Sequence, residues 1–223
     1  DYNDDFDQTN WEDKLETAVF RGGSTCHGVT VDTNLRLKAA HLSKKNFKDN
    51  DNVPFLNAGI TEWNLRPRKI EGCDKLQTID VESLEFGLSD FMSSQEQSNY
   101  KYILHIDGHV TAFRLSMELA MRSVVLIVES QWSNWYSKML EPYVHYVPVS
   151  FDLSDIFEKI KWCKQNDEKC KQISENARKF YEKYLCKNGI LDHLQHTVVS
   201  ICNKMKQPVE SMVNHVDSMV EKE

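Results

Sequence analysis

The stretch YKYILHIDGHVTAFRLSMELAMRSVVLIV, residues 100–128, decides the fold class. Tyr102–Ile106 is rich in strand-forming residues and ends at Asp107-Gly108, residues 112–121 carry apolar side chains at helical spacing, and residues 123–128 form a second apolar run. Two buried strands that are joined tightly through one helix are expected to be parallel, with a right-handed crossover. The stretch therefore predicts a Rossmann-like α/β layer, in which helices flank a parallel sheet.

The sequence before this stretch predicts one further strand and one further helix. Ala18–Phe20 is a compact apolar run that stops at the polar, glycine-bearing loop of residues 21–25. Residues 31–42 then carry apolar side chains at helical spacing, which predicts a helix. Residues 43–70 are polar and punctuated by turn-forming residues, so we expect mostly loop with short extended pieces there.

The sequence after this stretch predicts a third strand at residues 143–149 and then a series of helices. The helices begin near Asp152, resume after Asn166-Asp167 and continue with an amphipathic helix over residues 190–205. We therefore divide the chain into a disordered acidic start at residues 1–10, a Rossmann-like domain at residues 11–205 and an amphipathic C-terminal helix or tail at residues 206–223.

Composition excludes several classes of protein. The chain has 223 residues, of which 40% are hydrophobic and 27% charged; this is typical of a globular protein and not of collagen, a disordered chain or a coiled-coil rod. Its longest apolar run, residues 124–128, is far shorter than the roughly 20 residues that a membrane span requires. The formal net charge is -7 and no segment concentrates Lys and Arg, so we expect no nucleic-acid partner.

Six cysteines are spread along the chain without a C-x-x-C pair. No histidine lies at zinc-finger spacing from them, so we expect no structural metal site. Buried or free thiols are the favoured interpretation, and one or two disulfides formed in an oxidising lumen are the alternative. The cysteines are Cys26, Cys73, Cys163, Cys170, Cys186 and Cys202.

Two loops that follow predicted strands are suited to hold a phosphate group. In an open parallel sheet, ligands bind at the carboxyl ends of the strands. The loop of residues 21–25 combines two glycines with arginine, serine and threonine donors, and the segment 107–114 places Gly108 before a helix with Arg114 in its first turns. Together the two loops suggest a diphosphate site, although each alone is also typical of a tight turn.

Other motifs carry less weight. Neither G-x-G-x-x-G nor a Walker G-x-x-x-x-G-K-[ST] sequence occurs, so classical dinucleotide binding and P-loop phosphoryl transfer are not favoured. The D-x-D matches at residues 5–7 and 49–51 lie in polar segments, whereas Asp107 ends a predicted strand and is the better candidate for a functional acid. Among the histidines we single out His109, because it directly follows Asp107-Gly108.

Aromatic residues gather after the strand that ends at Val128. Their rings could stack on a uracil base or a sugar, although such side chains more often fill the core between a helix and a sheet. These residues are Trp132, Trp135, Tyr136, Tyr143 and Tyr146.

An ordered series of motifs runs along the chain from Trp11 to about Leu185. Its main members are FRGGST at residues 20–25, YKYILHIDG at residues 100–108, LEPYVHYVPV at residues 140–149 and DLSD at residues 152–155. As a set, these motifs resemble the protein O-glucosyltransferase family, which also contains the fungal capsule-associated xylosyltransferases and is classed as glycosyltransferase family 90.

The resemblance implies the donor-binding, C-terminal half of a GT-B glycosyltransferase. Such an enzyme holds a UDP-sugar as donor substrate, requires no cofactor, and transfers glucose or xylose with inversion to a hydroxyl group of a protein or glycan acceptor. By position in the motifs, the resemblance implies donor contacts from the two loops and from the arginine downstream of the first. The expected donor-binding residues are Arg21, Gly23, Ser24, Arg36, Gly108, His109, Val110, Thr111, Ala112, Phe113 and Arg114.

The sequence also departs from the family pattern. Cys26-His27 and His109 differ from the usual residues, so the donor sugar stays open. Only 19 residues precede Phe20 and none matches the family's catalytic base, so we expect an N-terminal domain or a partner chain to complete the enzyme. The alternative is a non-catalytic sugar-nucleotide or glycan-binding module of a larger assembly. The resemblance favours the lumen of the secretory pathway, and the cytoplasm is the alternative if no signal segment lies upstream.

Overall fold

The computed structural model describes residues 9–45, 47–49 and 52–220. Its internal contacts divide the chain into two units, of which the first ends at Tyr181 and the second begins at Glu182. The strands are β1 (Leu15–Gly22), β2 (Leu56–Ile60), β3 (Tyr100–His105), β4 (Val124–Val128) and β5 (Val147–Val149). The helices are α1 (Leu35–Lys44), α2 (Ser94–Gln97), α3 (Leu115–Ala120), α4 (Ile156–Gln165), α5 (Asp167–Phe180) and α6 (Lys187–Val220).

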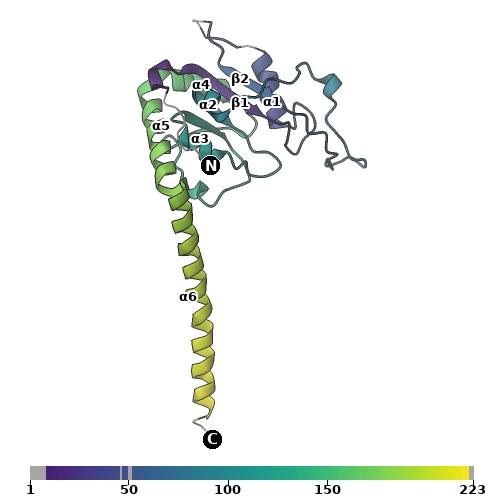
Figure 1. Ribbon diagram of the computed structural model, residues 1–223. Coiled ribbons are helices and arrows are strands. Elements are labelled where there is room, and N and C mark those ends of the chain that lie inside the picture. Colours follow the sequence, from purple (N-terminus) through teal and green to yellow (C-terminus); the bar gives the residue numbers. More distant parts are fainter. Residues whose placement is uncertain (1–8, 46, 50–51, 221–223) are drawn as a thin grey trace. The chain divides into compact units, whose positions relative to one another are not determined.

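The first unit is built on one sheet of five parallel strands in the order β2-β1-β3-β4-β5 (Figure 1). In register, Val19 of β1 lies beside Ile103 of β3, which lies beside Val125 of β4. The predicted fold class, a Rossmann-like parallel sheet flanked by helices, is confirmed.

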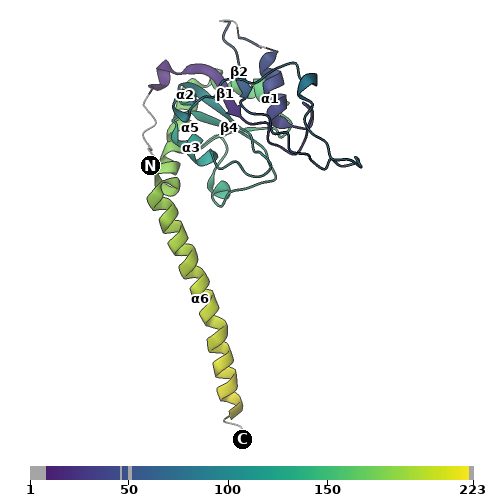
Figure 2. The ribbon, with the colours of Figure 1, turned by 45° about the vertical axis from the view of Figure 1, so that its right-hand side comes forward.

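Both faces of the sheet are covered, which explains why β3 and β4 are apolar without alternation. On one face, side chains such as Phe20, Leu104 and Leu126 belong to the main core, to which α1 and α4 also contribute. Figure 2 shows the ribbon of α1 beside β1 and β2. The opposite face carries a smaller cluster that includes Val19 and Ile103. A strand buried on both faces needs apolar residues at every position, and this is the pattern that the sequence shows.

Asn34 sets the start of α1. Its side-chain oxygen accepts hydrogen bonds from the amides of Arg36 and Leu37, which have no partner within the helix, and its amide nitrogen donates to the carbonyls of Ser24 and Gly28 at 3.1 Å each. The helix predicted over residues 31–42 therefore begins at Leu35 and ends at Lys44. The same cap ties the first turn of α1 to the loop that follows β1.

Three other predicted elements differ from the structure in extent. The helix predicted over residues 112–121 begins only at Leu115, so residues 107–114 form a loop. The strand predicted over residues 143–149 is limited to β5, because Tyr143 adopts a positive φ of 59° in the preceding turn. β2 lies in the segment predicted as mostly loop, and its mixed sequence LNAGI is stabilised as an edge strand by pairing with β1.

Towards the C-terminus, α6 runs continuously from Lys187 to Val220 and crosses the predicted boundary between residues 205 and 206, so that boundary stays a prediction. Residues 1–8 of the predicted disordered start and residues 221–223 lie outside the described residues. In the part of the chain that the structure describes, no helix has the length and apolar character needed to cross a membrane. All six cysteines are free thiols, as the favoured interpretation of the sequence predicts.

Candidate functional site

The carboxyl ends of β1 and β3 lie side by side at the point where the strand order changes direction. The chain leaves β1 towards β2 at one edge of the sheet, and it leaves β3 towards β4 and the other edge. Open parallel sheets bind their ligands in the crevice at such a switch point. Both loops that the sequence singles out, residues 21–25 and 107–114, begin here.

A cavity of about 530 Å³ lies between these two loops, and we call it the switch-point cavity. Most of the predicted donor-binding residues line it, namely Arg21, Arg36, Gly108, His109, Val110, Thr111, Ala112, Phe113 and Arg114. Gly23 and Ser24 are not among its lining residues. Ser24 is fully buried and its hydroxyl accepts a 2.7 Å hydrogen bond from the amide of Asn64, so this serine helps to hold the loop together; donor contacts from Gly23 and Ser24 stay a prediction.

Arg36 ties the two loops to each other. Its guanidinium donates to the carbonyls of Gly23, Ile106 and Asp107 at 3.1, 2.9 and 3.1 Å, and to the Thr25 hydroxyl at 2.6 Å. These bonds use four of its five N–H groups. Burial, together with the positive charge of Arg114, lowers the pKa of Arg36 to about 10, so the side chain stays charged at neutral pH. Its main role in this structure is to brace the site.

Arg114 reaches across the cavity to the end of β1. Its Nη1 donates a 2.6 Å hydrogen bond to the carbonyl of Arg21, and its guanidinium carbon lies 5.1 Å from the centre of the Phe20 ring. A Cβ added at Gly22 would lie 2.9 Å from Nη2 of Arg114. The missing side chain at Gly22 is therefore what allows the guanidinium to approach the backbone this closely.

Arg21 turns away from Arg114 towards the edge of the sheet. It donates to the backbone and side-chain oxygens of Asn57 in β2, at 2.8 and 2.9 Å, and burial lowers its pKa. Its Nε is buried without a hydrogen-bond partner among the described residues. The Nε2 atom of His109 is likewise buried without a partner there, and the pKa of His109 is lowered by burial and by the charge of Arg68. Each of these nitrogens has hydrogen-bonding capacity that the described part of the protein does not use.

Asp107 is engaged within its own loop. Its Oδ1 accepts a 2.7 Å hydrogen bond from the amide of Ala112 and lies 3.5 Å from Nε2 of His105. Burial opposes ionisation of Asp107, but His105, the Ala112 amide and the Ser130 hydroxyl outweigh it and lower the pKa of this carboxyl. These contacts give Asp107 a structural role in the loop, and a catalytic role for this acid stays a prediction.

Sequence reasoning missed Glu118, which lies behind the cavity. Its carboxylate is 2.5 Å from Nδ1 of His105 and 3.6 Å from Nε of Arg114. The signal that could have found it is a charged residue four positions after Arg114 on the apolar face of a predicted helix. Such a position demands an ionic or hydrogen-bonding partner in the core.

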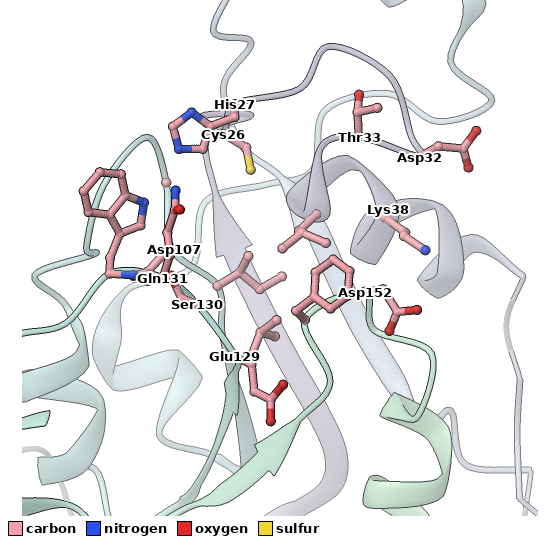
Figure 3. A pocket seen from close by; sticks show the side chains of 16 residues that line it. Cys26, His27, Asp32, Thr33, Lys38, Asp107, Glu129, Ser130, Gln131 and Asp152 are labelled. Carbon is pink, nitrogen blue, oxygen red and sulfur yellow. Dashed lines mark hydrogen bonds between the residues drawn. The ribbon is translucent and has the colours of Figure 1, made fainter. Parts of the chain in front are cut away.

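A second cavity of about 620 Å³ lies on the other side of Asp107 and Gly108, and Figure 3 shows its wall. His27 lies at one side of it. Trp132 also lines the cavity and stacks on His27, with ring centres 6.2 Å apart. Lys38 and Asp152 lie at the other side, where hydrogen bonds from Ser154 and, to a smaller extent, the charge of Lys38 lower the pKa of Asp152. We call this the aromatic cavity.

The predicted aromatic residues divide between core and cavity. Trp132 is 39% exposed and lines the aromatic cavity, which leaves one ring suited to stacking on a flat ligand. Tyr136 is buried, and the ring of Tyr143 packs edge-on against Trp162 at 5.2 Å. The core interpretation therefore applies to Tyr136 and Tyr143, and stacking of Trp132 on a ligand stays a prediction.

The D-x-D segments provide no metal centre in the described part of the chain. Residues 5–7, 50 and 51 lie outside that part, and Asp49 pairs with Lys164 at 2.6 Å. No group of three or more His, Cys, Asp or Glu side chains among the described residues is arranged to hold a metal ion.

Comparison with known proteins adds independent observations. Residues 1–221 match the family model described as glycosyl transferase family 90. The chain is 49% identical, over 98% of its length, to uncharacterized protein 179R of Invertebrate iridescent virus 6, and it covers 19% of that protein. It is 38% identical to protein O-glucosyltransferase 2 of Danio rerio, over 81% of this chain and 31% of the relative. For protein O-glucosyltransferase 3 of Homo sapiens the identity is 32%, over 76% of this chain and 28% of the relative.

The fold also matches a solved structure. TarM aligns with a TM-score of 0.52 and 14% identity, over 85% of this chain and 36% of that one. At this identity the match shows a shared fold. The chain spans less than a third of the length of the curated relatives named above. The family match over residues 1–221, together with these relatives, shows that the chain belongs to glycosyl transferase family 90.

Proposed function

We propose that this chain is the donor-binding part of a glycosyltransferase that uses a UDP-sugar and transfers glucose or xylose, with inversion, to a hydroxyl group of a protein or glycan. Family membership supports glycosyl transfer, and the names of the two O-glucosyltransferase relatives support glucose as the first sugar to test. The observation that carries the proposal is the guanidinium of Arg114 at the carboxyl ends of β1 and β3, on the wall of the switch-point cavity.

The diphosphate of the donor would occupy the switch-point cavity. Gly22 and Gly108 let the backbone come close to a ligand there, and Arg114 presents a charged, planar donor that suits phosphate oxygens. When the bond to the sugar breaks, negative charge grows on the departing UDP, and a fixed guanidinium stabilises that charge. Arg36 contributes by holding both loops in place.

The aromatic cavity would hold either the uracil base or the sugar of the donor. It shares Gly108 with the switch-point cavity, so one extended ligand can reach both. Trp132 and His27 offer ring faces. Lys38 and Asp152 offer polar groups on the side opposite His27 (Figure 3). Ring faces bind bases and sugars through stacking, which complements the charge at the first cavity.

The experiment is calorimetric titration of the full chain with UDP, UDP-glucose and UDP-xylose. Arg114→Gln should weaken UDP binding about 10- to 100-fold, because a charge-assisted hydrogen bond contributes about 1.5–3 kcal/mol. The matched control is Arg122→Gln at the exposed turn after α3, which removes the same charge at the opposite end of the sheet. Absence of UDP binding by the wild-type chain, or equal loss in both variants, would contradict the proposal.

A second candidate is a binding module that holds a sugar nucleotide or a glycan without transferring the sugar. The observation that favours it is the engagement of Asp107, the acid singled out from the sequence, by Ala112 and His105. Release of UDP from UDP-glucose in the presence of the chain alone would argue for transfer or hydrolysis. Tight UDP binding without release would favour the binding module, or an enzyme that an N-terminal domain or partner chain completes.

A further inference from the structure

Four charged side chains form a series that runs from the wall of the switch-point cavity into the core behind it, in the order Arg114, Glu118, His105 and Asp107, of which the two middle members are buried. Nε of Arg114 lies 3.6 Å from Oε1 of Glu118, whose Oε2 lies 2.5 Å from Nδ1 of His105. Nε2 of His105 lies 3.5 Å from Oδ1 of Asp107. Glu118 is 3% and His105 2% exposed, so these two groups exchange little with solvent. The UDP-sugar proposal above uses only the outer member, Arg114.

The two ends of this series shape the cavity wall. Arg114 donates to the carbonyl of Arg21 at the end of β1. Asp107 accepts from the amide of Ala112 and so closes the loop of residues 107–112. Glu118 and His105 do not line the switch-point cavity. They contact each other, and through this contact they link Arg114 on one wall of the cavity to Asp107 at the base of the other.

His105 connects both walls fully only when it carries two protons. A neutral imidazole donates from one nitrogen, whereas an imidazolium donates from both, and here each nitrogen faces a carboxylate. Burial acts to lower the pKa of His105, but the charge of Glu118, together with Asp107, outweighs burial and raises it. The folded protein therefore favours the doubly protonated form that serves both carboxylates.

The other titratable and charged groups near this pair are compatible with that state. Burial and the charge of Arg114 lower the pKa of Arg36 to about 10, while the charges of Glu118 and Asp107 act to raise it, so Arg36 stays protonated at neutral pH. Burial, with the charges of Glu118 and Asp107, raises the pKa of Tyr136, which stays neutral. Glu129 and Tyr146 line a separate cavity together with His105, and burial and Glu129 raise the pKa of Tyr146. The charge state of His105 therefore decides whether both carboxylates beside it have a donor.

We propose that Glu118 and His105 are positioning residues for the anion site: Glu118 orients the Arg114 guanidinium, and protonated His105 holds both Glu118 and Asp107. With His105 protonated, the two carboxylates and the two cations balance. Loss of the proton leaves one net negative charge behind the cavity and one carboxylate facing a nitrogen lone pair. Anion affinity therefore falls as the pH rises through the pKa of His105. The inference rests on the proposed function for the identity of the ligand.

The test measures the affinity of the full chain for UDP-glucose from about pH 6 to about pH 9.5, a range that begins near the ordinary histidine pKa of about 6.5 and extends above it because the pKa of His105 is raised. UDP-glucose is the probe because its diphosphate diester does not titrate in this range. In the wild type we expect affinity to fall about five- to tenfold across the range, the size of a modest coupling between two sites. Glu118→Gln and His105→Gln should bind more weakly at low pH and lose most of the pH dependence.

The matched control is Ser123→Ala, which removes a buried hydroxyl at the opposite end of the sheet. That hydroxyl donates to the carbonyl of Tyr100 and accepts from Lys14, so its loss should lower stability without touching the anion site. A merely structural role for Glu118 predicts that Glu118→Gln and Ser123→Ala behave alike, with the pH dependence intact. That result would overturn the inference.

A spectroscopic readout separates this inference from the proposed function. Nitrogen NMR shifts of His105 should report an imidazolium at neutral pH in the wild type and a lowered pKa in Glu118→Gln, with or without ligand. If the wild type binds no UDP-glucose but His105 titrates as described, the proposed function fails and the positioning pair stands. If UDP-glucose binds with an affinity independent of pH, the inference fails and the proposed function stands.

Discussion

The Arg114 guanidinium donates a 2.6 Å hydrogen bond to the carbonyl of Arg21, 93 residues earlier in the chain. The bond joins the residue just before α3 to the end of β1 and closes one side of the switch-point cavity. It exists because Gly22 has no side chain where the guanidinium lies. The site is thus assembled from two segments that are distant in the sequence but adjacent at the carboxyl ends of β1 and β3.

Gly22→Ala should displace Arg114. The added Cβ would lie 2.9 and 3.2 Å from its two terminal nitrogens, closer than such contacts normally allow, so the guanidinium must move. We expect UDP affinity to fall about tenfold, comparable with loss of one hydrogen bond to a charged group. Gly87→Ala is the control, since no atom lies within 4 Å of a Cβ there. Calorimetry checks both; unchanged affinity in Gly22→Ala would contradict the role given to Arg114.

Arg36→Lys should destabilise the fold. A lysine keeps the charge but cannot reach the carbonyls of Gly23, Ile106 and Asp107 together, and a buried acceptor without a donor costs about 1–3 kcal/mol. Urea unfolding measures the loss, with the exposed Arg66→Lys as control. Equal stability of the two variants would show that Arg36 does not brace the loops.

Trp132→Leu should weaken UDP-sugar binding more than Trp135→Leu. The two indoles have similar exposure, 39% and 43%, but only Trp132 is among the residues lining the aromatic cavity. Stacking of a base on an aromatic ring is worth about 1–3 kcal/mol, so we expect a loss of about five- to 150-fold. Calorimetric titration of both variants with UDP-glucose tests this prediction. Equal affinities of the two variants would show that the Trp132 ring does not contact the ligand.

The stability of the wild type should decrease as the pH rises above neutrality. The pKa of His105 is raised above its ordinary value of 6.5 by Glu118 and Asp107, against the effect of burial. Its contribution to the free energy of unfolding is therefore complete below about pH 6.5 and is lost as the pH rises through the folded-state pKa. Urea unfolding across this range should show the decrease in the wild type, while His105→Gln, which has no proton to lose there, should lack that component.

Removal of divalent metal should leave UDP affinity unchanged. Arg114 supplies positive charge at the site, and the described residues contain no cluster of three metal-ligating side chains. Titrations in EDTA and in manganese should give the same dissociation constant within about twofold, a difference worth only about 0.4 kcal/mol. A strong dependence on manganese would instead favour a metal-dependent transferase.

Much of the fold follows from the sequence because buried parallel strands have a strong pattern. Residues 102–106 and 124–128 are apolar at nearly every position, which is stable only between two covered faces. β2 has no such pattern, because Asn57 and Gly59 interrupt it and pairing with β1 stabilises it. Most of the candidate site could be predicted for a related reason: glycines and an arginine follow those strands directly.

The sequence by itself determined the α/β class, the two loops at strand ends and the family, because each of these is recognised from patterns of residues that are close together in the sequence. Only the tertiary structure decided what each polar or charged side chain does. It commits Arg36 to bracing the loops, buries Ser24, and brings Glu118 against His105. These roles depend on which donors and acceptors meet once water is excluded, and that is settled by the packing of α1 and α3 on the sheet rather than by any local pattern.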